Sequence, residues 1–335
     1  MHSRLLAVEI TKYGYIDKTG KMVIEPQFPE ARDFHEGLAY VSEGWGVKVR
    51  YIDQEGEVVF KSPSTDTGDF SEDLATIWGA GSCGYIDKKG KVVIPRNYYQ
   101  TFKFSEGLAR VNIGTYSEGK YGYIDKEGKY VVEPQFDDAE DFSCGLARVI
   151  VDEKYGFIDN KGKYVVEPEY TWASDFSEGL AGVMVGDKRG YIDTSGKVAI
   201  KPQFDGVYPF TPDGLARVTV DRSYAARDGY INKTGEFVIE AKYGRAFDFS
   251  EGLTRVSYAG EDLVINTEGE TVFKIDPTKY HITGPFKEDL ARIEVYPKFG
   301  YIDKTGKIVI KAEYEEVYDF SEGLARVSVT IEEEQ

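Results

Sequence analysis

The feature that most constrains this chain is a short motif that recurs along its whole length. The motif reads Gly-Tyr-Ile-Asp, two polar residues and Gly, and its first copy spans residues 14–20. Its isoleucine recurs at steps of 34 to 39 residues, at Ile16, Ile52, Ile86, Ile124, Ile158, Ile192, Ile231, Ile265 and Ile302. A period in this range is the signature of a repeat architecture. Nine copies fill the chain, so we expect residues 1–335 to form a single continuous repeat domain.

Each copy of this motif is typical of a β-hairpin. In the first copy, Asp17 can accept hydrogen bonds from the turn amides, and residues 22–24 continue as the second strand. The glycine that closes the turn needs a positive φ, and glycine stands there in every copy: Gly20, Gly56, Gly90, Gly128, Gly162, Gly196, Gly235, Gly269 and Gly306. The first motif therefore predicts nine hairpins.

A second motif follows each hairpin and predicts another strand. It reads Phe-Ser-Glu-Gly-Leu-Ala-Arg-Val in residues 104–111 and 320–327, with variants in the other repeats. We expect its leucine to point inward, and an aromatic residue after seven of the hairpins, such as Phe136, to fill the gap between neighbouring repeats. Each repeat then has three or four short strands and no convincing helix. One such repeat cannot bury its own apolar face, whereas stacked repeats can. The fold class is therefore an all-β tandem array of nine hairpin repeats.

The two ends of the chain bear on whether this array is open or closed. Residues 5–10 lead into Tyr13-Gly14 much as the Gly-Leu-Ala-Arg-Val strand leads into the next hairpin, and residues 323–327 end the chain with that same strand type. We therefore expect nine full repeats plus one extra strand, which an open β-superhelix or solenoid can use as a cap. The charged tail, residues 332–335, would blunt an exposed edge. The open array is preferred, and the alternative is a closed β-propeller-like ring.

The paired motifs resemble the bacterial WG-repeat family, also called KWG repeats. The Trp-Gly that names the family is mostly Tyr-Gly here, as at Tyr13-Gly14 and Tyr121-Gly122, and Trp45-Gly46 is nearest to it. The resemblance covers essentially the whole chain. It implies a β-rich repeat array, and it implies neither a catalytic site nor a general ligand.

The negative charge of the chain disfavours some classes of binding partner. The formal net charge is −17, which disfavours binding to phosphate backbones and to anionic membrane surfaces. No run of 18 apolar residues and no secretory signal is present, and Cys83 and Cys144 are most simply interpreted as unpaired thiols. We therefore expect a cytoplasmic protein that binds neither nucleic acid nor membrane.

No arrangement of residues in the sequence indicates catalysis. The three histidines, His2, His35 and His281, stand apart from one another and from any cysteine pair that would complete a metal site. No nucleophile–base pair and no phosphate-binding glycine loop is present. We expect the protein not to be an enzyme, and we expect no catalytic residue, cofactor or metal.

Two acidic columns recur beside the second motif, and each allows two interpretations. One column precedes its phenylalanine, at Asp33, Asp69, Asp141, Asp175, Asp248 and Asp319; the other follows two residues later, at Glu36, Glu72, Glu106, Glu178, Glu251 and Glu322. Either they form an acidic stripe for a basic partner or Ca²⁺, or they cap turns and pair with Arg110, Arg148, Arg217, Arg255, Arg292 and Arg326 of stacked repeats. We favour capping and pairing.

The candidate binding surface is an aromatic column in the first motif. It comprises Tyr15, Tyr51, Tyr85, Tyr123, Phe157, Tyr191, Tyr230 and Tyr301. By strand alternation these side chains face away from the inward isoleucines. If exposed, they would form a ladder that binds sugars or peptides. The competing and favoured interpretation is that they pack against the next repeat.

These features predict a non-catalytic scaffold for protein–protein interaction. Because the chain is acidic, a partner with a basic surface would suit it best. The alternative is a carbohydrate or cell-wall binding module that uses the tyrosine ladder.

Repeats two and eight break the pattern, because Asp73 and Asp289 replace the glycine of Gly-Leu-Ala and irregular stretches, 62–68 and 275–284, follow their hairpins. Departures of this kind are where function or capping tends to lie.

Overall fold

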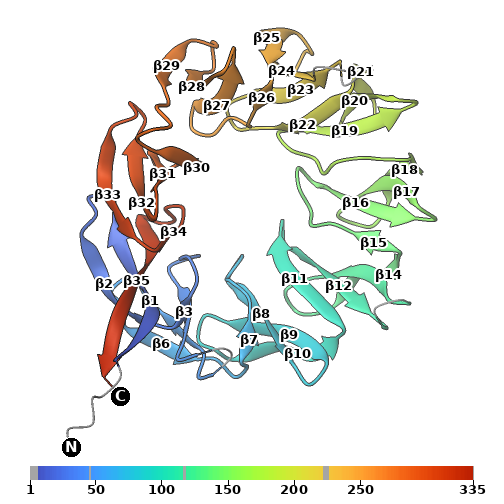
Figure 1. Cartoon of the computed structure of the whole chain (residues 1–335). Coiled ribbons are helices and arrows are strands. Elements are labelled where there is room, and N and C mark those ends of the chain that lie inside the picture. Colours follow the sequence, from blue (N-terminus) through green and yellow to red (C-terminus); the bar gives the residue numbers. More distant parts are fainter. Residues whose placement is uncertain (1–6, 45–46, 116–117, 222–225, 335) are drawn as a thin grey trace, which may run out of the picture. The chain divides into compact units, whose positions relative to one another are not determined.

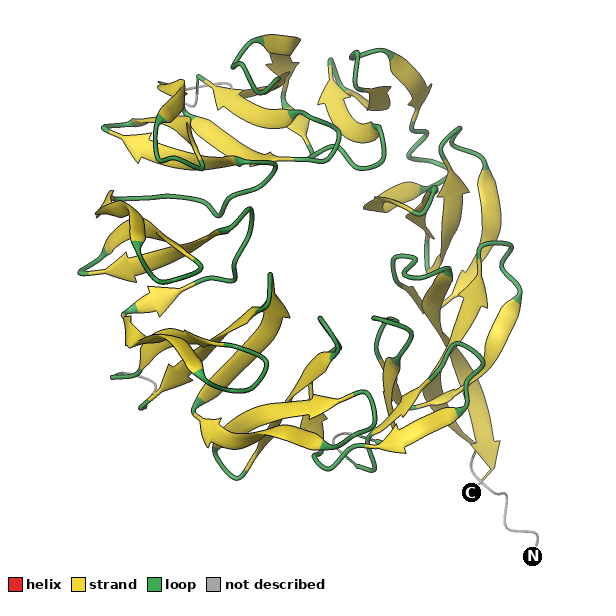
Figure 2. Ribbon diagram, turned by 180° about the vertical axis from the view of Figure 1, so that it is seen from behind, coloured by secondary structure: helices red, strands yellow, loops and turns green. Residues whose placement is uncertain are grey.

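The computed structural model describes residues 7–44, 47–115, 118–221 and 226–334. Strands and connecting loops make up this part of the chain, and Figure 2 shows no helix in it. The strands form nine antiparallel sheets. None of the described residues belongs to a helix that could cross a membrane. The predicted all-β array of nine repeats is confirmed.

The chain divides into two compact units. Compact unit 1 consists of residues 1–77, 87–91 and 276–335, and compact unit 2 consists of residues 78–86 and 92–275. The boundary falls within one sheet, formed by β7 (Asp66–Thr67), β8 (Leu74–Gly79), β9 (Ser82–Asp87) and β10 (Val92–Tyr98). That residues 1–335 form a single domain stays a prediction.

Compact unit 1 contains three complete sheets. In the order of their strands they are β34 (Glu316–Val317), β35 (Leu324–Glu334), β1 (Ala7–Asp17) and β2 (Met22–Phe28); β3 (Glu30–Ala31), β4 (Ala39–Ser42), β5 (Arg50–Ile52) and β6 (Val58–Lys61); and β30 (His281–Lys287), β31 (Leu290–Val295), β32 (Lys298–Asp303) and β33 (Ile308–Tyr314).

Compact unit 2 contains five complete sheets. They are β11 (Gln100–Ser105), β12 (Leu108–Ile113), β13 (Lys120–Ile124) and β14 (Tyr130–Phe136); β15 (Asp138–Ala139), β16 (Leu146–Val151), β17 (Lys154–Asp159) and β18 (Tyr164–Tyr170); β19 (Leu180–Val185), β20 (Lys188–Asp193) and β21 (Val198–Phe204); β22 (Gly206–Phe210), β23 (Ala216–Val220), β24 (Arg227–Ile231) and β25 (Phe237–Tyr243); and β26 (Arg245–Ala246), β27 (Leu253–Tyr258), β28 (Glu261–Asn266) and β29 (Thr271–Lys274).

Each sheet combines parts of two neighbouring sequence repeats. In the sheet β15–β18, the first two strands follow the hairpin of one repeat, and β17 and β18 are the hairpin of the next. Six residue pairs join β16 to β17, from Leu146↔Asp159 to Val151↔Lys154. A single sequence repeat therefore cannot form a whole sheet. Each repeat needs its neighbour in the chain to complete one.

The first and last strands of the chain share one sheet. β1 pairs with β35 along its whole length, through eleven residue pairs from Ala7↔Glu334 to Asp17↔Leu324. Figure 1 shows the two strands side by side next to both termini.

This pairing makes the preferred open array wrong. Residues 7–10 are not an extra strand, because they run without a break into the hairpin strand that ends at Asp17. The charged tail is not a free edge either, since Glu332 to Glu334 pair with Ala7 to Glu9. Residues 5–6 lie outside the described part. Paired ends agree with the alternative, a closed β-propeller-like ring, in which both ends of the chain complete a common sheet.

The hairpin turns have the predicted chemistry. All nine turn glycines have φ between +75° and +86°, where a side chain would be strained. Asp17 Oδ1 accepts hydrogen bonds from the amides of Thr19 (2.8 Å) and Lys21 (3.1 Å). The hairpin prediction is therefore confirmed in detail.

The core lies between successive sheets. The leucine of the second motif is buried in every repeat, as predicted. One apolar cluster joins Tyr123 and Phe136 of the sheet β11–β14 to Val149 and Ile158 of the sheet β15–β18. Phe136 thus fills the gap between two sheets, as expected for this aromatic position.

Candidate functional site

The aromatic column proposed as a binding surface is buried. Its eight members are at most 1% exposed: Tyr15, Tyr51, Tyr85, Tyr123, Phe157, Tyr191, Tyr230 and Tyr301. The ladder that a sugar or peptide would contact does not exist, and the competing interpretation of packing is correct. Each ring meets the phenylalanine of the following second motif at a centroid distance of 4.7 to 5.1 Å.

The hydroxyl groups of this column complete the packing. Tyr123 donates a 2.6 Å hydrogen bond to the carbonyl oxygen of Glu140, 17 residues further along. The same hydrogen bond, to the carbonyl oxygen 17 residues further along, is donated by Tyr15, Tyr85, Tyr191, Tyr230 and Tyr301. Burial raises the pKa of the Tyr123 hydroxyl well above its usual range. These phenols are therefore neutral structural donors.

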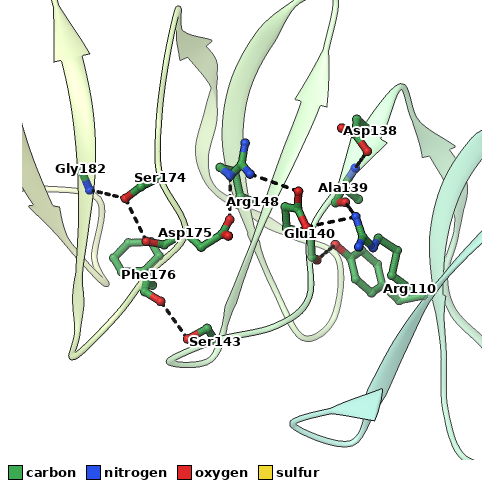
Figure 3. Close-up of polar contacts among 11 residues, drawn as sticks. Arg110, Asp138, Ala139, Glu140, Ser143, Arg148, Ser174, Asp175, Phe176 and Gly182 are labelled. Carbon is green, nitrogen blue, oxygen red and sulfur yellow. Dashed lines mark hydrogen bonds and ion pairs between the residues drawn. The ribbon is translucent and has the colours of Figure 1, made fainter. Parts of the chain in front are cut away.

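The aspartate column pairs with arginine, as favoured from the sequence. Figure 3 shows Arg148 of β16 beside Asp175, with Nε 2.7 Å from Oδ1. Equivalent pairs join Arg326 to Asp33, Arg110 to Asp141, Arg217 to Asp248 and Arg292 to Asp319, and Arg32 is the partner of Asp69. These pairs link one sheet to the next, so the aspartates are not a free acidic stripe.

Members of the glutamate column hold the turn of the following sheet. Glu36 accepts hydrogen bonds from the amides of Glu72 (2.6 Å) and Asp73 (2.9 Å). Glu322 does the same for Glu36 and Gly37. The turn amides converge because Glu36 and Gly37 both have positive φ, which forms a small anion-binding concavity. Turn capping is the interpretation favoured from the sequence, and these contacts confirm it; only the fold shows that the capped turn belongs to the following sheet.

The histidines and carboxylates were the remaining candidates for a metal site. Within the described residues, no group of three or more histidine, cysteine, aspartate or glutamate side chains could hold a metal ion. His35 lies beside Asp69, with Nε2 3.8 Å from Oδ2.

A band of exposed apolar side chains follows the edge strands of the sheets. We call it the edge band, and its members are 38 to 52% exposed: Val23, Val58, Val59, Val92, Val93, Val131, Val198, Val238, Val272, Ile308 and Val309. They lie on β2, β6, β10, β14, β21, β25, β29 and β33, each the last strand of its sheet. The hairpin pattern could have located this band. On the second strand of the hairpin, the residue next to a buried position such as Val132 points outward, as Val131 does.

A polar cavity of about 630 Å³ lies beside the loop between β12 and β13. Gln100, Asn112 and Tyr121 line it from three adjacent strands, and Asp137 and Asp138 line it from the start of the next sheet. Sequence reasoning missed this site. The signal was the long step of 38 residues between Ile86 and Ile124, which marks an inserted loop.

One protein family matches most of the chain. The family described as "WG containing repeat" matches residues 13–44, 84–116, 121–155, 155–188, 190–224, 229–260 and 299–329, well over half of the chain. The chain belongs to the WG-repeat family. The two longest stretches of this WG-repeat protein left unmatched, 45–83 and 261–298, contain Asp73 and Asp289, which replace glycine with φ of 71° and 74°.

Solved structures similar to this WG-repeat protein have low identity to it. Apo AztD from Citrobacter koseri is 11% identical, with 98% of this chain and 100% of that chain covered and a TM-score of 0.40. Kluyveromyces lactis Hsv2p is 10% identical (71% and 92% covered, TM-score 0.40). Porphyromonas gingivalis dipeptidyl peptidase 4 is 8% identical (83% and 52% covered, TM-score 0.47). No curated protein matches the chain in sequence.

Proposed function

We propose that this WG-repeat protein is a non-catalytic, cytoplasmic scaffold that binds another protein along its edge band. The observation that carries the proposal is the regular exposure of valine and isoleucine on the last strand of successive sheets. The other repeated features, the aromatic column and the acidic columns, are occupied by packing and pairing between sheets.

The edge band suits contact through side chains rather than strand addition. Proline follows the exposed valines in several edge strands, as at Pro26 and Pro134, and it removes an amide that an added strand would need. A partner that contacts two or more edge strands at once would gain affinity through multivalency.

Charge indicates the chemistry of the partner. The chain has a net charge of −17, so basic residues around an apolar contact would speed association and strengthen it at low salt. The same charge supports the expectation that neither nucleic acid nor an anionic membrane is the partner.

The test is affinity capture from native cytoplasm at moderate salt, with the full chain as bait. We expect a reproducible protein partner, and we expect Val92→Lys combined with Val131→Lys to abolish its capture. The matched control is Asn97→Lys combined with Gln135→Lys, which adds the same charge to the same two strands at exposed positions outside the band. Capture of no reproducible partner, or equal capture by the valine variant, contradicts the proposal.

A further inference from the structure

One sheet of compact unit 2 has three strands where the sheets before and after it have four. The sheet β19–β21 lacks the first strand that β15 and β22 supply to those two sheets. Residues 171–173 stand in its place and contact β19 through the isolated bridge Ala173↔Val183. A cavity of about 390 Å³ lies beside this segment, within the roughly 300–1,000 Å³ of small-molecule sites.

The cavity is accessible and has mainly apolar walls. Its lining consists of Glu169, Tyr170, Thr171, Met184, Val185 and Gly186. Val185 is 52% exposed, and Tyr170 is only partly buried, whereas the matching aromatic residues Phe136 and Phe204 are at most 2% exposed. A Cβ added at Gly186 would meet no atom within 4 Å. A ligand can therefore reach the groups that line this cavity.

The sheets before and after this one hold a carboxylate at the position of Thr171. Asp137 stands there in the sheet β15–β18 and forms an ion pair with Lys120, the first residue of β13. Asp205 stands there in the sheet β22–β25 and forms an ion pair with Lys188, the first residue of β20, at 2.6 Å. In both pairs the acid follows the lysine by 17 residues. The repeat thus provides a lysine that holds an internal carboxylate.

Lys154 is the corresponding lysine at the cavity. It is the first residue of β17 and stands 17 positions before Thr171. The residue after it, Tyr155, pairs with Tyr170 of the cavity wall. Threonine has no negative charge to offer, and Lys154 forms no ion pair within the described residues. The cation that holds an internal carboxylate in two other places is therefore available to a carboxylate from outside.

The loop glycine supplies a second donor. Gly186 begins the turn between β19 and β20, and Asp152 begins the equivalent turn between β16 and β17, with φ of 62° and 48°. The Asp152 amide donates a 2.8 Å hydrogen bond to Asp137 Oδ2. The Gly186 amide makes no hydrogen bond in the part of the chain that the structure describes. An ammonium group and an amide therefore lie around the place that a carboxylate occupies in the sheet β15–β18.

We infer that this cavity, which we call the Thr171 pocket, binds a free α-amino acid with an apolar side chain. The carboxylate of the ligand takes the place of the Asp137 carboxylate and binds Lys154 and the Gly186 amide. The Thr171 hydroxyl can donate a further hydrogen bond to it. The pocket lies apart from the edge band, so it does not depend on the proposed protein partner.

The rest of the pocket selects a zwitterion rather than a simple anion. Glu169 is exposed and forms no ion pair among the residues described, so its carboxylate is available to the ammonium group of the ligand. Asp187, next to the loop glycine, is exposed as well and disfavours a ligand with net negative charge. Met184, Val185 and the ring of Tyr170 offer an apolar surface to the ligand side chain.

The experiment is NMR titration of the full chain, labelled with ¹³C at its methionine methyl groups, with leucine, methionine and phenylalanine. The chain has three methionines, Met1, Met22 and Met184, and only the last lines the pocket. We expect a saturable shift of the Met184 methyl signal and none of the Met22 signal. Leucinamide, which lacks the carboxylate, and 4-methylpentanoate, which lacks the ammonium group, should each bind roughly fivefold more weakly than leucine. Absence of a saturable Met184 shift with all three amino acids overturns the inference, as does leucinamide or 4-methylpentanoate binding as tightly as leucine.

Three variants identify the groups that bind the ligand. Thr171→Asp supplies an internal carboxylate for Lys154, so it should weaken leucine binding about tenfold or more while the melting temperature stays unchanged or rises. Lys154→Gln should weaken binding roughly fivefold, and it decides the matter if Thr171→Asp does not fold. The matched control is Lys120→Gln, which removes the same charge where Asp137 is the partner and should leave the affinity unchanged. Wild-type affinity in Thr171→Asp or in Lys154→Gln overturns the inference, and so does equal weakening in Lys120→Gln.

Discussion

Two sheets of this WG-repeat protein have the same strand order but different origins in the chain. The sheet β15–β18 is built from the continuous residues 138–170, whereas the sheet β34–β35–β1–β2 joins residues 316–334 to residues 7–28. Their contacts with the next sheet match: Ser143 and Ser321 each donate a 2.8 Å hydrogen bond to a phenylalanine carbonyl. We call them the internal sheet and the terminal sheet.

The two sheets differ in how much pairing holds their central strands. A two-residue turn and six residue pairs join β16 to β17, while eleven pairs join β1 to β35 without any turn. Closing a loop of about 300 residues rather than about 10 costs roughly 3 kcal/mol more in chain entropy. A longer ladder of paired residues therefore replaces the chain connection where the two ends meet.

The largest expected effect comes from shortening this ladder. Deleting residues 328–335 removes seven of the eleven pairs between β1 and β35. We expect the free energy of unfolding to fall by more than about 3 kcal/mol, because each lost backbone hydrogen bond contributes roughly 0.5–1.5 kcal/mol. Urea denaturation followed by circular dichroism measures it. An unchanged midpoint would show that these pairs do not stabilise the fold.

A circular permutant provides the matched control for the deletion. A short linker joins residues 334 and 7, which are paired neighbours, and new ends are opened at residues 152–153 of the internal sheet. We expect a folded protein of nearly native stability, because the contacts are kept and only the position of the break moves. Loss of folding in the permutant would show that chain continuity of the internal sheet matters more than its contacts.

Removing the arginine of each sheet should have a smaller and equal effect. Arg326 of the terminal sheet pairs with Asp33 (3.2 Å), and Arg148 of the internal sheet pairs with Asp175 (2.7 Å). Arg326→Ala and Arg148→Ala should each cost about 2 kcal/mol, because a carboxylate loses its cation and the next sheet loses a contact. Thermal and urea melts compare them. A difference above about 1 kcal/mol would mean that the terminal sheet is not energetically equivalent to the internal one.

Turn glycines should give effects of about 1–2 kcal/mol. A Cβ added at Gly162 of the internal sheet would lie 2.9 Å from Val132 Cγ2, and one at Gly20 of the terminal sheet 3.3 Å from Ile310 Cγ2. Both residues have positive φ, so both Gly→Ala variants are strained, and Gly162→Ala should be the worse. Lys161→Ala, exposed in the same turn, should leave the melting temperature unchanged. Equal melting of all three variants would contradict the hairpin chemistry.

The smallest expected effect concerns pH. The hydrogen bond from the Thr19 hydroxyl is the main cause that lowers the pKa of Asp17, and the Lys163 amide does so for Asp159. A lowered pKa stabilises the folded chain above the unfolded value of about 3.9, and this stabilisation is lost as pH falls through the folded pKa.

Asparagine should remove this pH dependence in both sheets. Asn232 already accepts the same turn hydrogen bonds, from the amides of Thr234 (3.0 Å) and Glu236 (3.1 Å). Asp17→Asn and Asp159→Asn should therefore melt like the wild type at pH 7 and lose less stability than it does below about pH 4. Melting temperatures from pH 7 to pH 2 test this. Curves parallel to the wild type would contradict it.

The sequence determined every feature that is local to one repeat. The turn glycine and the aspartate or asparagine before it fix each hairpin within seven residues, and strand alternation places residues such as Leu146 in the core. The arginine and aspartate columns could be paired from their periodicity, because stacked repeats bring equal positions together. These inferences hold because each depends on a few neighbouring residues and on the repeat itself.

Tertiary structure decided what lies opposite each element. Alternation shows that Tyr123 faces away from its neighbour Ile124, but not that both side chains are fully buried in the fold. The pairing of β1 with β35 joins residues more than 300 positions apart, and no local pattern encodes such a contact. The polar cavity beside the loop between β12 and β13 likewise needs that loop, three strands and the start of the next sheet in one place. Burial, closure and cavities arise from contacts between distant segments, and for that physical reason only the folded chain reveals them.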